Sequence, residues 1–175
     1  MKKLKLLLLD AGPIIALYRL NLWEQIIERC EISITRTIAE AEALYSPGEY
    51  EDIKIDLKPF HEKGQINIID CDYSIVRDFL EKFDNSYQQN IHPRELESLA
   101  FMDSSNDSWT LCSADASVFK VLGILGRTEQ GISLEELLDK IGLSKKLNVW
   151  KYTKKFRLHY SKLGQQDSIQ NRGLK

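Results

Sequence analysis

Short apolar runs alternate along the chain with segments whose apolar positions recur every three or four residues. Four of the apolar runs predict strands, at 4–9, 31–34, 66–70 and 109–115. The run 4–9 carries leucines on both faces, which is typical of a buried parallel strand. Helical periodicity predicts helices at 12–30, 38–45, 73–83, 92–102, 116–125 and 132–143. This alternation predicts an α/β fold in which helices cover both faces of a mostly parallel sheet.

Boundary signals refine these elements. Pro13 suits a first helical turn, and Asn21 marks a break within the segment 12–30. Ser133 and Glu136 have the spacing of a capping box at the start of the last helix of this series. The segment 46–64 is rich in loop formers and is expected to hold one short helix.

The charges divide the chain into two parts. Residues 144–175 contain nine Lys or Arg and one acid, a balance of +8, and the whole chain carries −2, which leaves −10 for residues 1–143. We therefore predict an α/β domain over 1–143 and a basic, partly helical C-terminal extension over 144–175. The last polar residues of this extension are expected to fray.

Composition excludes several classes of protein. No apolar run reaches the roughly 18–20 residues that span a bilayer, and Asp10 interrupts the leucine-rich start with no small-residue cleavage site after it. A soluble cytoplasmic protein is expected. The three cysteines lack disulfide or zinc spacing and are interpreted as buried thiols, and the three tryptophans as packing residues.

Acidic residues follow the predicted strands where parallel strands end. Asp10 and Asp115 each follow an apolar strand, and Asp70 does the same. Glu40 and Glu95 lie on helices that follow loops at that same edge, where open α/β sheets bind their ligands. Several carboxylates in one cleft repel one another unless a cation neutralises them, and carboxylate oxygens suit Mg²⁺ or Mn²⁺.

Four segments together resemble the PIN domain, a family of metal-dependent ribonucleases that includes the toxins of many bacterial toxin–antitoxin pairs. They are LLLDAGPIIAL, TIAEAEAL, RELESLAF and TLCSADASVFKVLGILG, and the resemblance covers about residues 4–143. It implies a three-layer α/β/α sandwich around a mostly parallel sheet of about five strands. It also implies Mg²⁺ or Mn²⁺ as cofactor and RNA as substrate.

The resemblance assigns roles to individual residues. Asp10, Glu40, Glu95 and Asp115 match the four acids that hold the metal and carry catalysis. Ser113 stands where the family has a threonine, and its hydroxyl would orient a carboxylate or a metal-bound water. Each of these residues also has a simpler interpretation. Asp10 suits a turn, Asp115 suits a helix N-cap, and Glu40 and Glu95 suit solvated helix positions.

Departures from the family pattern leave some roles open. Arg94 replaces a glycine beside the third acid, where it would either grip a phosphate or displace a metal by occupying the carboxylates. Glu97 is a rival for the third role, but positions two apart on a helix face about 200° from each other, so both cannot easily enter one cleft. Glu42 is likewise a rival to Glu40.

The extension interleaves aromatic and basic residues between 145 and 162. Its predicted nucleic-acid-binding residues are Lys151, Lys154, Lys155 and Arg157, together with Arg94 from the domain. Such a segment suits contact with phosphates and bases, docking on the acidic domain, or a solvated end, and these three interpretations stay open.

The sequence thus predicts a ribonuclease in which metal-activated water hydrolyses RNA phosphodiester bonds. The alternative is an inactive PIN-like module that binds RNA or protein. Predicted partners are the RNA substrate, an antitoxin protein and a second copy of the chain, with no membrane.

Other doubly wound phosphate enzymes fit less well. Gly12 stands where haloacid-dehalogenase-like phosphatases need a second Asp, and it does not by itself make a glycine-rich phosphate loop.

Overall fold

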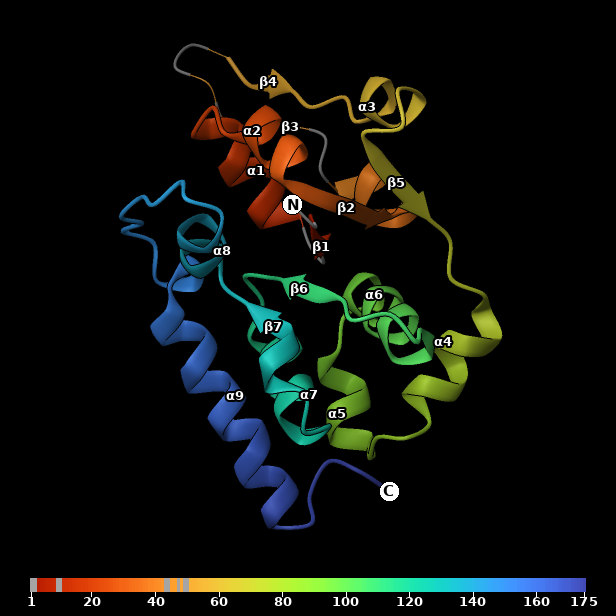
Figure 1. Cartoon of the computed structure of the whole chain (residues 1–175). Coiled ribbons are helices and arrows are strands. Elements are labelled where there is room, and N and C mark those ends of the chain that lie inside the picture. Colours follow the sequence, from red (N-terminus) through yellow and green to blue (C-terminus); the bar gives the residue numbers. More distant parts are fainter. Residues whose placement is uncertain (1–2, 9–10, 43–44, 47, 49–50) are drawn as a thin grey trace.

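Five parallel strands form the centre of the molecule (Figure 1). The computed structural model describes residues 3–8, 11–42, 45–46, 48 and 51–175. The strands are β1 (Leu4–Leu8), β2 (Cys30–Thr35), β5 (Ile66–Ile69), β6 (Thr110–Cys112) and β7 (Gly131–Ile132). They lie side by side in the order β5-β2-β1-β6-β7, and every neighbouring pair is parallel. All four strands predicted from apolar runs are confirmed, and β7 is an addition.

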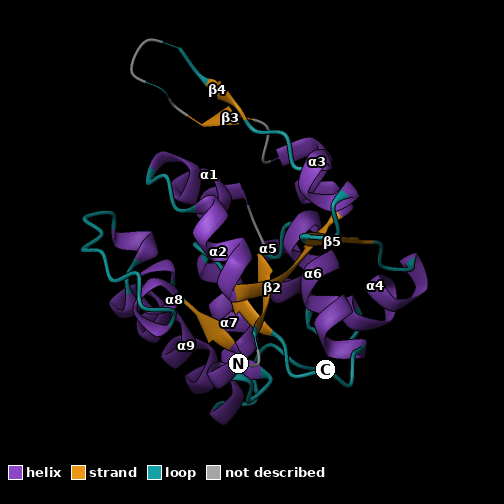
Figure 2. Ribbon diagram, turned by 45° about the horizontal axis from the view of Figure 1, so that its top comes forward, coloured by secondary structure: helices purple, strands orange, loops and turns teal. Residues whose placement is uncertain are grey.

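Two groups of helices cover the two faces of this sheet (Figure 2). One apolar cluster involves α1 (Ala11–Arg19), α2 (Trp23–Arg29), α3 (Lys58–Glu62) and α8 (Leu134–Lys140). The other involves α4 (Tyr73–Leu80), α5 (Asn85–Asn90), α6 (Pro93–Ser104), α7 (Ala116–Ile124) and α9 (Lys154–Ile169). Cys112 belongs to the first cluster and Leu111 to the second, as alternating strand positions require. The predicted three-layer α/β/α fold is therefore confirmed.

The strand order creates a switch point between β1 and β6. From β1 the chain adds β2 and β5 on one side, then returns to add β6 and β7 on the other. Leu8 of β1 pairs with Cys112 of β6, so the two strands end level with each other. The loops that leave neighbouring strands in opposite directions open a crevice at such a point, which is where α/β folds bind ligands.

Local sequence signals explain several boundaries. Asn21 adopts a left-handed conformation with φ of 54°, and this separates α1 from α2. Ser133 and Glu136 form the predicted capping box at the start of α8. Short elements were missed: α5, and an antiparallel pair β3 (Tyr45–Ser46) and β4 (Ile53–Lys54). The predicted helix 38–45 is a π-helical segment, Ile38–Glu42, in the described residues.

The C-terminal segment packs on the domain. Helix α9 lies along α7, and backbone meets backbone where Gly123 faces Ser161 and Gly164 faces Lys120. The end of the chain does not fray as expected: the Asp84 N–H donates to the Gly173 carbonyl at 2.8 Å. A pattern of side chains does not reveal backbone hydrogen bonds. The polar composition of the last residues therefore predicted fraying that does not occur.

Burial of the remaining predicted packing residues is mixed. Cys30, Cys112, Trp23 and Trp109 are buried, and Cys71 is half-buried. Trp150 is 52 % exposed but packs edge-on against Phe156, so it is a packing residue at the surface and not a core residue. Within the described part of the chain, no helix combines the length and apolar character needed to cross a bilayer.

Candidate active site at the end of the sheet

Glu95 is a fully buried carboxylate in the first turn of α6. Its Oε1 atom accepts a hydrogen bond from Nε of Arg94 at 2.9 Å. Its Oε2 atom is buried and has no hydrogen-bond partner among the described residues. Buried polar atoms nearly always have a partner, so an orphaned carboxylate oxygen points to a missing ligand. The simpler interpretation of Glu95 as a solvated helix position is excluded.

Asp115 lies close enough to Glu95 for the two charges to interact. Burial raises the pKa of Glu95 most strongly, the hydrogen bond from Arg94 lowers it, and the negative charge of Asp115 raises it again. The net effect is a raised pKa, since one guanidinium does not compensate both burial and a neighbouring carboxylate. A cation between the two carboxylates would remove this repulsion.

The turn after β6 fixes Asp115. This residue is the N-cap of α7, and its Oδ1 atom accepts hydrogen bonds at 2.7 Å from both the backbone N–H and the hydroxyl of Ser117. The Asp115 N–H in turn donates to the hydroxyl oxygen of buried Ser113 at 2.9 Å. The capping interpretation of Asp115 therefore holds, and it orients the carboxylate without consuming both of its oxygens in these bonds.

Glu40 is not brought to Glu95 and Asp115 in this arrangement. Its side chain is 59 % exposed and pairs with Arg36 at 2.6 Å. Arg36 also holds Asp70 with two hydrogen bonds of 2.8 and 3.0 Å, which lower the pKa of Asp70. Glu40 thus belongs to an exposed ion cluster on the β5 side of the sheet, and Asp70 is accounted for by the same cluster.

The remaining acids complete this account. Asp10 lies outside the described residues, and so do the side chain of Glu42 and its role as rival to Glu40. Glu97 is half-buried, in contrast to the fully buried Glu95. Within the part of the chain that the structure describes, no three His, Cys, Asp or Glu side chains gather closely enough to hold a metal ion.

Two buried hydroxyl groups near the candidate site were not predicted from the sequence. Thr35 is the last residue of β2, Ser98 lies one turn after Glu95, and neither hydroxyl has a hydrogen-bond partner among the described residues. Both side chains are fully buried. A polar residue that ends an apolar strand was a signal for Thr35, whereas Ser98 had no distinguishing pattern. Both hydroxyls could bind ordered water.

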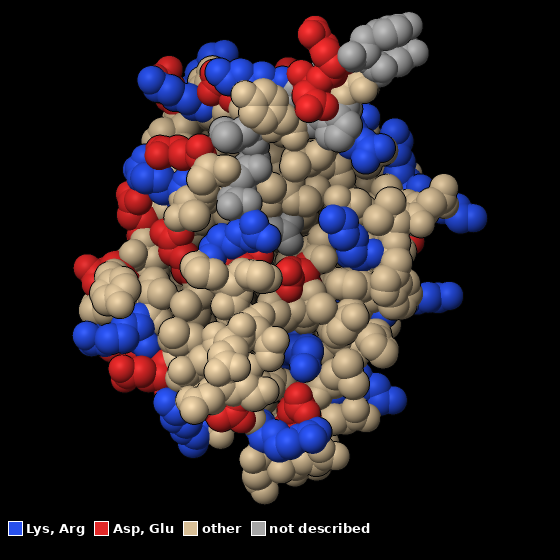
Figure 3. All heavy atoms as spheres, turned by 180° about the vertical axis from the view of Figure 1, so that it is seen from behind, with Lys and Arg blue, Asp and Glu red and all other residues tan. Residues whose placement is uncertain are grey.

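The basic residues of the extension have different surroundings. Lys151, Lys154 and Lys155 are exposed, whereas Arg157 is only 12 % exposed and forms a two-point ion pair with Glu136. The Tyr152 hydroxyl donates to the carbonyl of Gly12 at 3.2 Å, so this segment is attached next to the start of α1. Acidic and basic side chains are interspersed over the face shown in Figure 3.

Comparison of the chain with family models, curated proteins and solved structures found no match.

Proposed function

We propose that the chain is a Mg²⁺- or Mn²⁺-dependent ribonuclease whose active site lies at the switch point between β1 and β6. The observation that carries this proposal is the buried, orphaned Oε2 atom of Glu95 beside the carboxylate of Asp115. Asp10 is included on the basis of the sequence. It lies two residues after Leu8 and Asp115 lies three residues after Cys112, and Leu8 and Cys112 are paired at the ends of β1 and β6.

The donor set fits a hard divalent cation. Glu95 offers an oxygen that lacks a partner among the described residues, and Asp115 offers a carboxylate held in place by Ser117. When bound, Mg²⁺ or Mn²⁺ supplies an activated water and stabilises negative charge on a phosphodiester. Glu40 would join these ligands only after releasing Arg36, which now holds it.

Residues around the carboxylates have distinct roles in this proposal. Ser113 accepts the Asp115 N–H and so keeps the turn that presents this carboxylate. The side chain of Arg94 is 38 % exposed at the edge of the site. Once a cation neutralises Glu95, the guanidinium of Arg94 would donate to a phosphate oxygen of the RNA, because planar guanidinium groups suit phosphate geometry.

The start of the extension supports RNA binding beside this site. The exposed ring of Trp150 is held edge-on by Phe156, with ring centroids 5.8 Å apart. Lys151, Lys154 and Lys155 follow it along the chain, and such a combination suits stacking of unpaired bases with contacts to phosphates. Arg157 is left out of this surface because Glu136 holds its guanidinium.

The test is cleavage of a mixed RNA pool in Mn²⁺ by the wild-type chain, Asp10→Asn and Glu95→Gln. We expect both variants to lose more than about 100-fold in rate, because losing a residue that merely supports a metal ligand already costs about 10- to 100-fold. Glu97→Gln, on the same helix, is the matched control and should cut like the wild type. Equal cleavage by all four proteins would assign the activity to a contaminant.

A second candidate function is a PIN-like module that binds without cutting. The ion pairs of Glu95 with Arg94 and of Glu40 with Arg36 favour it, since in both a guanidinium already pairs with a carboxylate that would have to bind the metal ion. Titration calorimetry with Mn²⁺ separates the two functions. The ribonuclease requires uptake that Asp10→Asn abolishes, whereas the binding module shows none. An antitoxin partner and a dimer stay predictions of the family resemblance.

A further inference from the structure

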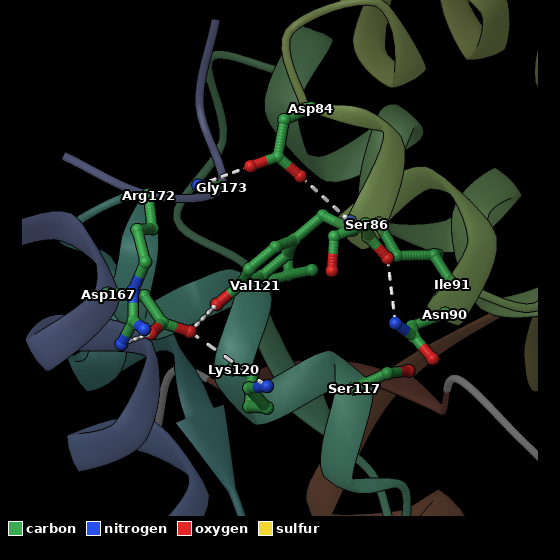
Figure 4. Close-up of a pocket in the computed structure, with 11 residues that line it drawn as sticks. Asp84, Ser86, Asn90, Ile91, Ser117, Lys120, Val121, Asp167, Arg172 and Gly173 are labelled. Atoms are coloured by element: carbon green, nitrogen blue, oxygen red, sulfur yellow. Dashed lines mark hydrogen bonds and ion pairs between the residues drawn. The ribbon is translucent and has the colours of Figure 1, made fainter.

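A cavity of about 260 Å³ lies between α5, α7 and the end of the chain (Figure 4). Asn90 and Ile91 line one side, Asp167 and Arg172 the other, and Lys120 reaches in from α7. The volume is slightly below the roughly 300–1,000 Å³ of pockets for drug-sized ligands, so one small group fills it.

The charges of this cavity are already balanced by one another. Asp167 accepts the Tyr87 hydroxyl at 2.6 Å and pairs with Arg172 at 2.7 Å and with Lys120 at 3.9 Å. Asp84 accepts the backbone N–H groups of Tyr87 and Gly173. A charged ligand would have to break these pairs, and a neutral ligand would not.

The walls of the cavity combine apolar surface with side chains that form hydrogen bonds. Ile91 and Val121 are buried and supply apolar contact, and Tyr87 contributes a largely buried ring. Asn90 and Ser86 are exposed residues that line the cavity; the Asn90 amide nitrogen donates one hydrogen bond to the Ser86 carbonyl at 2.7 Å, and its second N–H, its Oδ1 atom and the Ser86 hydroxyl could bind a ligand. A flat heterocycle with a polar edge matches this lining, because its faces need apolar contact and its edge needs hydrogen bonds.

The cavity adjoins the candidate active site through one residue. Ser117 lines the cavity, and its hydroxyl donates to Oδ1 of Asp115 at 2.7 Å. A nucleotide whose phosphate lies at Asp115 can therefore place its base toward α5. Arg172, 62 % exposed, lies on the other side of the cavity, where it pairs with Asp167.

We infer that this cavity binds one unpaired nucleobase of the RNA next to the bond that is cut, and so selects the cleavage site. The inference rests on the proposed ribonuclease function for its biological meaning. Its binding step, however, requires neither the metal nor the four acids.

The experiment compares the wild-type chain with Asn90→Trp, which fills the cavity. Gln89→Trp is the control, because Gln89 is exposed on the same helix and does not line the cavity. Binding of AMP, GMP, CMP and UMP is measured in EDTA by saturation-transfer NMR. Cleavage positions in a random-sequence RNA are then mapped with Mn²⁺. Circular dichroism checks that each variant folds, and Asn90→Ala replaces Asn90→Trp if it does not.

We expect at least one nucleotide to bind the wild type and Gln89→Trp, and Asn90→Trp to bind it about ten-fold or more weakly. Cuts by the wild type should cluster beside that base, and Asn90→Trp should lose this preference. The inference is overturned if none of the four nucleotides binds, or if Asn90→Trp binds and selects as the wild type does. Nucleotide binding without any cleavage would support the cavity and refute the ribonuclease. Cleavage without base preference or nucleotide binding would do the reverse.

Discussion

At the scale of single residues, Glu95 is the most informative side chain. Burial raises its pKa above the ordinary value of 4.5, the Arg94 bond lowers it, and the Asp115 charge raises it further. The folded chain therefore holds this proton more tightly than the unfolded chain does. The free energy of unfolding must fall as pH rises from 4.5 through the raised pKa.

Glu95→Gln should remove this pH dependence. In EDTA at neutral pH, we expect the variant to unfold at a higher temperature than the wild type, because no buried carboxylate is left to ionise. Adding Mn²⁺ should stabilise the wild type alone, since a ligand stabilises only the protein that binds it. Thermal unfolding between pH 4 and pH 8 measures both effects.

Glu97→Gln provides the comparison, since Glu97 is half-buried two residues along α6. Its unfolding should keep the pH dependence of the wild type. If Glu95→Gln instead lowers the unfolding temperature at neutral pH, the carboxylate is a structural partner of Arg94 and the metal proposal loses its main support.

Residue types and strand ends identified candidate acids from the sequence, but they could not rank them by environment. The sequence places both Glu40 and Glu95 on helices near the same edge of the sheet. In the structure the Glu40 side chain is 59 % exposed beside Arg36, whereas Glu95 is fully buried. The difference depends on contacts between segments far apart in the chain. Arg36 follows β2 and Asp70 follows β5, so the two partners of this cluster lie 34 residues apart and no local pattern pairs them.

At the scale of elements, the junction of α8 and α9 carries a part-buried ion pair. Glu136 accepts both the hydroxyl of Ser133 and the guanidinium of Arg157, and the Glu136 side chain is 18 % exposed. Burial raises its pKa, but the hydrogen bonds from Arg157 and Ser133 outweigh burial, and the pKa is lowered. This stabilisation is present above the ordinary value of 4.5 and is lost as pH falls through the lowered pKa.

Glu136→Gln should destabilise the fold by about 1.5–3 kcal/mol at neutral pH, the usual range for hydrogen bonds to charged groups. The deficit should shrink at acidic pH, where the wild type loses the same charge. Urea unfolding at pH 7 and at pH 3 measures it. Asp139→Asn, at an exposed position of the same helix, should change stability little. An equal loss at both pH values would show that shape, and not charge, matters at this junction.

The elements themselves were predictable in proportion to their length and periodicity. The capping box of Ser133 and Glu136 is a local signal and is confirmed, whereas the partner of Glu136 on α9 lies 21 residues away and left no signal. Strand β7 has two residues, too few for a period. Helix α5 has one buried residue, Tyr87, in an otherwise polar segment, so its amphipathic pattern is absent.

At the scale of the whole molecule, helix α7 connects the C-terminal segment with the candidate site. The +8 charge of residues 144–175 left three interpretations open, and the packing agrees with docking on the domain: α9 packs against α7, and the last residues bond to the turn before α5. Composition reports charge, whereas docking depends on two glycines and on backbone bonds. Asp115 caps the start of α7, so the packing of α9 on α7 also bears on the position of this candidate site residue.

Gly164→Ala tests this link. A Cβ atom at position 164 would overlap the backbone of Lys120, so α7 and α9 must move apart, and over-packing of this kind costs about 1–3 kcal/mol. Because α7 carries Asp115 at its start and Lys120 in the cavity wall, we expect RNA cleavage to fall even at temperatures where the variant is fully folded. Gln165→Ala, at an exposed position next along α9, should leave both stability and cleavage unchanged. A Gly164→Ala variant that is less stable but cuts at the wild-type rate when folded would show that α9 supports the fold without positioning the site.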